Sequence, residues 1–178
     1  MAYFSQFPKL TYDLLADGNV TVVPDIFRRI KIKDKIKNNV IILDKYDLFD
    51  GEKPEDVSYK IYGSTDYYWV VLLINNIVDR YYDWPMSYAD FEKFVNDKYE
   101  EPAANHHYEV LQSSGRQEGL SPDDHSQYIE VNSNHQGAQS VSNYDYEQRL
   151  QNQKRQIKVL NPDYLSSFVD EFEKLIRR

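Results

Sequence analysis

The chain contains no cysteine in its 178 residues. This absence excludes disulfide bonds, thiolate nucleophiles and cysteine-ligated zinc, and it is compatible with assembly in a reducing cytoplasm. Long hydrophobic runs are also missing, because the longest, residues 67–74, is far shorter than the roughly 20 residues that a helix needs to cross a bilayer. The first residues lack the basic and apolar segments of a signal peptide, so we expect neither secretion by that route nor a membrane span.

Glycine is scarce, with 6 residues in the whole chain, and the motifs of common catalytic and cofactor sites are missing. We find no Gly-x-x-x-x-Gly-Lys-Ser/Thr phosphate loop, no Gly-x-Gly-x-x-Gly, no His-Glu-x-x-His and no Gly-x-Ser-x-Gly. Asp44, Asp47 and Asp50 recur at every third position, whereas the ligands of an EF-hand loop fall at alternate positions. We therefore expect a protein that is not an enzyme, with no cofactor and no metal ion.

All the histidines lie in a polar segment, residues 101–142, which is rich in Ser, Asn, Gln and Gly. A zinc site needs ligands at spacings that a helix or turn can bring together, and the spacing here matches no such pattern. We interpret these side chains as solvated loop residues: His106, His107, His125 and His135.

Acidic residues outnumber basic ones: the chain has 29 Asp and Glu but 21 Lys and Arg, and its net charge is −8. That balance disfavours a footprint on nucleic acid phosphates, so we expect no nucleic acid partner. Residues 28–37 break the trend, because basic and apolar residues alternate there with a period of two, as in an exposed strand or an extended arm. This stretch is either a solvated strand face or a docking surface for an acidic neighbour, which could be another copy of this chain.

Two short helices are predicted back to back in the middle of the chain. Pro54 suits the first helical turn, where its missing N–H costs nothing, and Gly63 offers the left-handed conformation that ends a helix. Ser64 or Thr65 then caps a second helix. Residues 67–74 are all aromatic or aliphatic, so this second helix has no polar face and is predicted to be buried.

Strand-like alternation at residues 41–49 precedes the helices, and an aromatic-rich stretch at residues 77–86 follows them. We interpret the second stretch as a strand too, which gives the order strand, helix, helix, strand and an α+β fold class. A third helix is predicted from Ser87, a capping residue, to about Tyr99. We divide the chain into an extended N-terminal arm (1–43), a βααβ module with the following helix (44–100), a polar insertion or hairpin loop (101–142) and a C-terminal helix–strand–helix segment (143–178).

Two pieces of the polar insertion, residues 108–111 and 128–131, have the pattern of strands that pair as a hairpin. Residues 156–160 are predicted as a short strand before the clearest helix of the chain, which Asn161 caps. The apolar stripe of that helix faces either its own domain or another subunit: Leu165, Phe168, Val169, Phe172, Leu175 and Ile176.

Several groups of residues across nearly the whole chain resemble the LysM-like baseplate wedge protein family of contractile-tailed bacteriophages, a family of T-even-like wedge subunits: Asp25–Arg28, Pro54–Glu55, Tyr62–Gly63 with Tyr68–Val70 and Leu72, Tyr82-x-Trp84 and Arg155–Val159. The resemblance implies a structural protein that links neighbouring wedge subunits around the tail hub. It also implies contacts with other baseplate wedge proteins, with the central tail hub as a further candidate. The expected location is the virion tail baseplate, and the host cytoplasm during assembly.

The alternative is a peptidoglycan-binding LysM-type module. In that family the sugar lies between the loops that here match residues 50–53 and 75–78. The usual Gly-Asp-Thr/Ser is replaced by Gly51-Glu-Lys-Pro54, whose long charged side chains would crowd a shallow groove. We therefore do not expect carbohydrate as a ligand, and we interpret Trp69 as a core residue rather than a sugar-stacking one.

Tyrosine is abundant, with 16 residues, and its amphipathic side chain is favoured at protein interfaces. The tyrosines are either half-buried domain surface or contacts for a partner protein, and we favour partners. Our candidates for a protein interface are Phe27, Arg28, Arg29, Tyr67, Tyr68, Tyr82 and Trp84.

Overall fold

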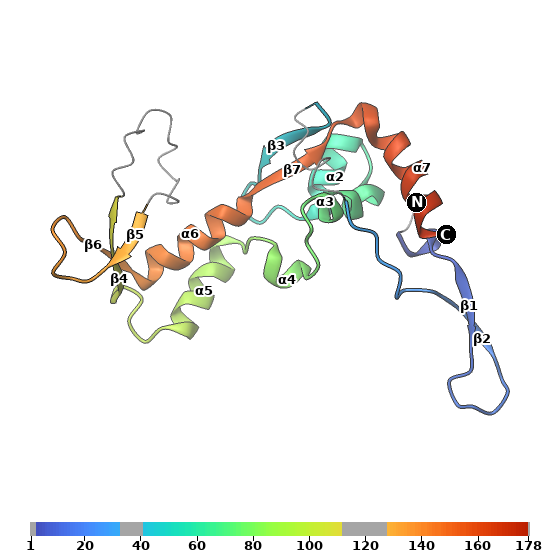
Figure 1. Cartoon of the computed structure of the whole chain (residues 1–178), viewed down its shortest axis with the longest axis horizontal. Coiled ribbons are helices and arrows are strands. Elements are labelled where there is room, and N and C mark those ends of the chain that lie inside the picture. The colour runs from blue at the N-terminus through green and yellow to red at the C-terminus, as the bar shows by residue number, and fades with distance from the viewer. Residues whose placement is uncertain (1–2, 33–40, 112–127, 178) are drawn as a thin grey trace. The chain divides into compact units, whose positions relative to one another are not determined.

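The computed structural model describes residues 3–32, 41–111 and 128–177, which form an α+β fold with small sheets and six α-helices (Figure 1). The predicted fold class is confirmed at this level. The chain divides into two compact units. Unit 1 comprises residues 1–48, 52–83 and 157–178, and unit 2 comprises residues 49–51 and 84–156. None of the helices in the described part of the chain combines the length and apolar character that crossing a membrane requires.

Unit 1 begins with a β-hairpin, where the sequence predicted an extended arm. A 3₁₀ turn, η1 (Tyr3–Gln6), precedes β1 (Lys9–Tyr12), which pairs antiparallel with β2 (Thr21–Pro24). Both flanks of the hairpin enter the core of unit 1, because Phe7 and Ile32 are buried. The arm is therefore attached at both ends. The strand considered for residues 28–37 is not seen at residues 28–32, and residues 33–37 lie outside the described part of the chain.

The two helices predicted in the middle of the chain are confirmed. Helix α2 (Pro54–Tyr62) starts at its proline and ends at Gly63, whose φ of 72° is left-handed and whose N–H donates to Tyr59 O over 3.0 Å. A 3₁₀ turn, η2 (Thr65–Tyr67), follows, and the Ser64 hydroxyl caps it by accepting from Asp66 N. Helix α3 (Tyr68–Ile74) is then largely buried, as its apolar sequence predicts.

The strand predicted at residues 77–86 is wrong. Part of that stretch is the short helix α4 (Arg80–Asp83). Two aspartates bind the backbone there and compete with strand pairing: the Asp83 carboxylate accepts from the N–H groups of Val78 and Asp79 at 3.0 Å each, and Asp79 accepts from Tyr81 N at 2.8 Å.

The partner of β3 (Leu43–Asp47) comes instead from the far end of the chain. It is β7 (Gln156–Leu160), and these strands form a two-stranded sheet. Asn161 N donates to Ile42 O over 2.9 Å, so the end of β7 lies beside the start of β3 and the strands run antiparallel. Strand, helix, helix and strand therefore do meet in unit 1, with most of unit 2 inserted between α4 and β7.

Polar side chains attach the two central helices to β7. The Asn75 side-chain amide donates to Lys158 O over 2.7 Å and accepts from Lys158 N over 2.8 Å, in the manner of a strand neighbour. The Tyr62 hydroxyl accepts from Leu160 N over 3.1 Å. These contacts fix the helices against a strand that lies more than 80 residues later in the sequence.

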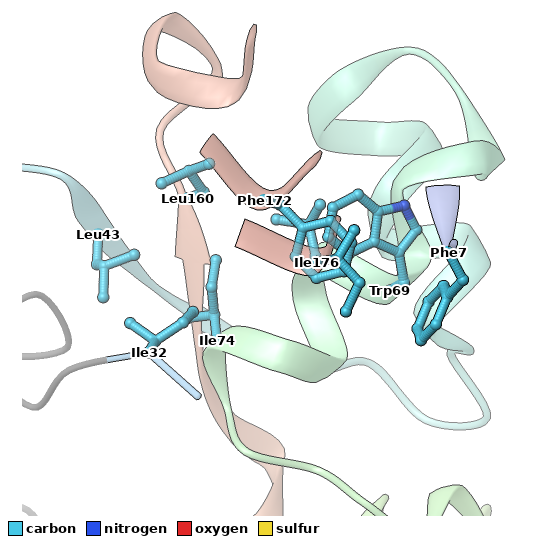
Figure 2. Close-up of a cluster of buried hydrophobic side chains, with 9 residues drawn as sticks. Phe7, Ile32, Leu43, Trp69, Ile74, Leu160, Phe172 and Ile176 are labelled. Atoms are coloured by element: carbon cyan, nitrogen blue, oxygen red, sulfur yellow. The ribbon is translucent and has the colours of Figure 1, made fainter. Parts of the chain in front are cut away.

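The core of unit 1 gathers side chains from all of its segments (Figure 2). Helix α7 (Leu165–Ile176) follows η3 (Pro162–Tyr164), which Asn161 caps as predicted. Its predicted apolar stripe faces this core, with the exception of Leu175, which is 41% exposed. Leu175 is the neighbour of buried Ile176, so it lies about 100° around the helix from it and outside the stripe. The buried residues are Phe7, Ile32, Leu43, Trp69, Val70, Ile74, Leu160, Phe172 and Ile176.

Unit 2 combines two helices with a three-stranded sheet. Helix α5 (Tyr88–Lys98) starts at the predicted cap Ser87, and α6 (Asn143–Arg155) also matches a predicted helix. The sheet order is β5-β4-β6. Its strands are β4 (Asn105–Leu111), β5 (Tyr128–Val131) and β6 (Gln139–Ser142). The predicted hairpin is confirmed, since Tyr108 lies opposite Val131, whereas β6 was not predicted.

Buried carboxylates with partners hold unit 2 together. Glu147 of α6 accepts from Lys98 Nζ at 2.6 Å and from the Tyr99 hydroxyl at 2.8 Å. Glu109 of β4 accepts from Arg149 Nη1 at 2.8 Å. These bonds connect α6 to the end of α5 and to the sheet.

Candidate protein-docking groove

A groove of about 550 Å³ is hollowed into unit 1. Three stretches of the chain line it: η1 with the residue after it, the segment that follows the hairpin, and α3 with the turn beyond it. In these stretches the lining residues are Tyr3, Phe4 and Phe7; residues 26–31; and Tyr68, Trp69, Leu72, Leu73 and residues 76–78. We call this feature the groove.

The floor of the groove is an aromatic cluster. The Tyr3 ring lies 5.0 Å from Phe7 and 5.6 Å from Trp69, and Trp69 lies 4.5 Å from Phe172 beneath it, measured between ring centroids. Figure 2 shows Phe7 from the N-terminal segment lying close to Trp69 of α3. Burial, with a smaller contribution from Tyr68, raises the pKa of Tyr3, so its phenol is neutral at physiological pH.

The rim of the groove exposes large apolar side chains. Phe27 is 91% exposed, Val78 66%, Ile26 59% and Phe4 55%. Single exposed apolar residues are ordinary, but several around one concave apolar site are typical of a surface that binds a partner.

The rim also carries positive charge from three basic residues, Arg28, Arg29 and Lys31, which differ in their contacts. Arg28 is engaged within unit 1, since its Nε donates to Asp25 at 2.9 Å and its Nη1 donates to Ile176 O at the end of α7 at 3.1 Å. Arg29 and Lys31 are exposed, and within the described ranges neither forms an ion pair. Arg28 therefore positions the segment, while Arg29 and Lys31 leave their charges free for a partner.

Four of the seven candidate residues from the sequence come together here: Phe27, Arg28, Arg29 and Tyr68. The other three lie elsewhere. Tyr67 packs edge-on against Tyr62 with centroids 6.1 Å apart, Tyr82 is 74% exposed on α4, and Trp84 is buried in unit 2.

Sequence reasoning missed the contribution of η1 to the groove. The available signal was the spacing of Tyr3, Phe4 and Phe7, which places three aromatic residues on one face of a single helical turn. These residues fall in the predicted extended arm, yet Tyr3 packs against Trp69 of α3.

The histidines are engaged with their neighbours. The Nδ1 atoms of His106 and His107 lie 2.9 Å apart, the His106 ring stacks on Tyr146 at 4.0 Å, and His135 Nδ1 lies 2.9 Å from Gln136 O. His125 lies outside the described residues. Across residues 3–32, 41–111 and 128–177, no group of three His, Asp or Glu side chains could hold a metal ion.

The loops that match a LysM sugar site have their polar groups occupied. Glu52 is buried and accepts from the Tyr46 hydroxyl at 2.9 Å and from Lys60. Asn75 is bound to β7, as described above. Trp69 is only 3% exposed, so its indole has no free face for a sugar ring. The interpretation of Trp69 as a core residue is confirmed.

Comparison with known proteins gives the family. The profile of the family "Base plate wedge protein 53" matches residues 2–117, which is more than half of the chain. "Baseplate wedge protein gp53" of Enterobacteria phage T4 is 25% identical over 172 residues, which cover 90% of this chain and 88% of that protein. The chain therefore belongs to the base plate wedge protein 53 family, whose members are structural, non-enzymatic components of the phage tail baseplate.

Proposed function

We propose that this chain links neighbouring wedge subunits around the tail hub, and that the groove of unit 1 receives a segment of a neighbouring subunit. The supporting observation is the combination, in one concavity, of an aromatic floor, an exposed apolar rim and two cations, Arg29 and Lys31, that form no ion pair with any residue the structure describes. Family membership implies contacts with other baseplate proteins. The central tail hub is a further candidate partner.

The size and chemistry of the groove restrict what can bind there. Its volume of about 550 Å³ falls within the ~300–1,000 Å³ typical of pockets for small ligands. It can therefore take a few side chains of a loop or short segment rather than a domain. Aromatic and Arg side chains dominate the binding energy of protein interfaces, and burial of Phe27 alone would contribute about 1.5–3 kcal/mol. Arg29 and Lys31 favour an apolar segment that also carries acidic residues.

We also propose that unit 1 contains a split LysM-like module. The order β3, α2, α3, β7, with β3 and β7 paired in one sheet, supports this proposal. The module would act as a rigid scaffold, because α3 provides one wall of the groove while Asn75 and Tyr62 hold the helices on β7. Peptidoglycan binding remains the alternative function, and buried Trp69 weighs against it.

Tail assembly tests the docking role of the groove. A phage that lacks this chain is complemented with Phe27→Ser or with the double variant Arg29→Glu/Lys31→Glu, and complete tails are counted by electron microscopy. We expect far fewer complete tails, because these exposed side chains contribute to binding and not to the fold. Ile129→Ser is the matched control, since Ile129 is an exposed apolar residue in unit 2.

Tail numbers equal to those of the control would refute the docking role, provided that circular dichroism shows all variants folded. The peptidoglycan alternative is tested separately with purified protein and intact cell-wall sacculi, and we expect no cosedimentation.

A further inference from the structure

The tip of the β1–β2 hairpin has surface properties that the proposed function leaves unexplained. Leu14 and Leu15 are 75% and 76% exposed, and Val20 is 63% exposed on the other side of the loop. Loop tips are ordinarily polar, so adjacent exposed leucines at such a position indicate a contact with another surface.

The tip is held in shape by its own aspartates. Asp13 accepts from Asp17 N at 3.3 Å and from Gly18 N at 2.9 Å, and Asp17 accepts from Asn19 N at 2.9 Å. Ala16 and Gly18 have positive φ values of 55° and 85°. Because the turn is fixed before any partner arrives, docking would require little ordering of the backbone.

The hairpin tip and the groove are complementary in chemistry. The tip presents apolar Leu14 and Leu15 between the carboxylates of Asp13 and Asp17, and hydrogen bonds from Asn19 lower the pKa of Asp17 and keep it ionised. The groove presents an apolar floor beside Arg29 and Lys31. We infer that the tip of one copy of this chain occupies the groove of a second copy.

The hairpin cannot fill its own groove without bending back on itself. Asp25 N donates to Pro8 O over 2.8 Å, which fixes the base of the hairpin beside the groove-lining residues. The four residues of each strand then carry the tip away by about 13 Å at ~3.3 Å per residue. Figure 1 shows the loop that joins β1 and β2 at the end of the hairpin remote from the chain termini. Insertion therefore takes place between molecules.

A contact of this kind is heterologous, because the tip and the groove are different surfaces. Each copy gives a tip to one neighbour and receives a tip from another, so the contact closes into a ring when the rotation between copies permits it. This inference rests on the proposed docking role of the groove and names its occupant.

Engineered disulfides test the contact directly, since the chain has no cysteine of its own. Full-length protein with Leu15→Cys and a size tag is mixed with untagged full-length protein carrying Phe27→Cys, and the mixture is oxidised. Both positions are exposed, at 76% and 91%, so neither change disturbs the core. The control mixture pairs Leu15→Cys with Ile129→Cys.

We expect the tip–groove pair to form the mixed disulfide about tenfold or more faster than the control pair, because a disulfide requires Cα atoms within about 7 Å. Adding Arg29→Glu/Lys31→Glu to the Phe27→Cys partner should slow the reaction several-fold. Equal rates for the two pairs, or no effect of charge reversal, would overturn the inference.

Tail assembly separates this inference from the function on which it rests. Leu14→Ser/Leu15→Ser should reduce complete tails as Phe27→Ser does. Normal tails with the tip variant and few tails with Phe27→Ser would show that another segment occupies the groove, so that only the inference fails. Normal tails with both variants would refute the inference and the docking role together.

Discussion

The two units differ in how completely their buried polar side chains are paired. Unit 2 buries Glu109, Glu147 and Gln151, and each has a partner within 3.1 Å. Unit 1 also pairs a buried carboxylate, since Glu52 accepts from the Tyr46 hydroxyl and from Lys60. In addition it buries the amide of Gln6, for which neither Nε2 nor Oε1 finds a hydrogen-bond partner in the described residues.

The difference follows from what each unit has available for packing. Unit 1 gathers a large aromatic and aliphatic cluster, and such a core tolerates the cost of an isolated polar group. Among the residues of unit 2 that the structure describes, the buried apolar ones are few: Trp84, Phe91, Val95 and Val141. We therefore expect the stability of this unit to depend more on paired charges. Each of the 2 tryptophans of the chain lies in a different unit, so fluorescence can follow each unit separately.

The largest effect is expected at the aromatic cluster of unit 1. Trp69→Ala removes a ring that is 3% exposed, and it should lower the free energy of unfolding by about 3–5 kcal/mol. Urea titration followed by circular dichroism measures the change. Tyr81→Ala serves as the control, because Tyr81 is 85% exposed and its loss should change stability by less than about 0.5 kcal/mol.

Unit 2 should respond most to the loss of a buried charge. Glu147→Gln weakens the bonds from Lys98 and Tyr99 and should cost about 1.5–3 kcal/mol, which is typical of hydrogen bonds to charged groups. Trp84 fluorescence in a Trp69→Phe background reports this unit. Glu171→Gln on exposed α7 surface is the control, and equal stability of both variants would contradict the role given to paired charges.

The same comparison predicts a gain of stability in unit 1. Gln6→Met keeps a similar side-chain volume and removes two unpaired buried polar atoms, so it should stabilise unit 1 by about 1–3 kcal/mol. Trp69 fluorescence in a Trp84→Phe background measures the urea midpoint. Gln153→Met, at an exposed position, is the control. A loss of stability would show that the Gln6 amide does have partners.

The smallest effect concerns Tyr62, which joins α2 to β7. Burial, with a smaller contribution from Asp44, raises the pKa of Tyr62 to about 12. The hydrogen bond from Leu160 N lowers this pKa, but by less than burial raises it. The folded chain favours the neutral phenol. The resulting contribution of Tyr62 to the free energy of unfolding is therefore complete below about pH 10 and is lost as the pH rises toward about 12. Tyr62→Phe should cost about 1 kcal/mol at neutral pH.

The pH dependence provides the check on Tyr62. Urea midpoints of the wild type should fall more steeply than those of Tyr62→Phe between about pH 10 and about pH 12. Parallel curves would show that Tyr62 is not held neutral by the fold.

Helices and strands could be predicted from the sequence where nearby residues mark their ends or show a clear alternating pattern. Pro54 and Gly63 mark the two ends of α2, Ser87 marks the start of α5, and the alternation at residues 108–111 and 128–131 gives the β4–β5 hairpin. In each case the residues that decide the structure lie within or beside the element.

Pairings between distant segments could not be predicted in this way. The aromatic residues at 77–86 have strand propensity, but Asp79 and Asp83 bind the backbone there, and β7 takes the place beside β3. In the groove, the sequence indicated Phe27, Arg28, Arg29 and Tyr68. The sequence did not indicate that η1 would fold back onto α3.

The insertion of unit 2 also has a consequence for the order in which a growing chain can fold. Strand β3 and helices α2 and α3 leave the ribosome early, but their partners β7 and α7 are made last. Unit 2 is nearly continuous in sequence and can fold while the chain is still growing, whereas unit 1 must wait for the C-terminal residues. Until then Trp69 and Leu43 lack the side chains that cover them, so a prematurely terminated chain would expose its core and be a substrate for proteolysis.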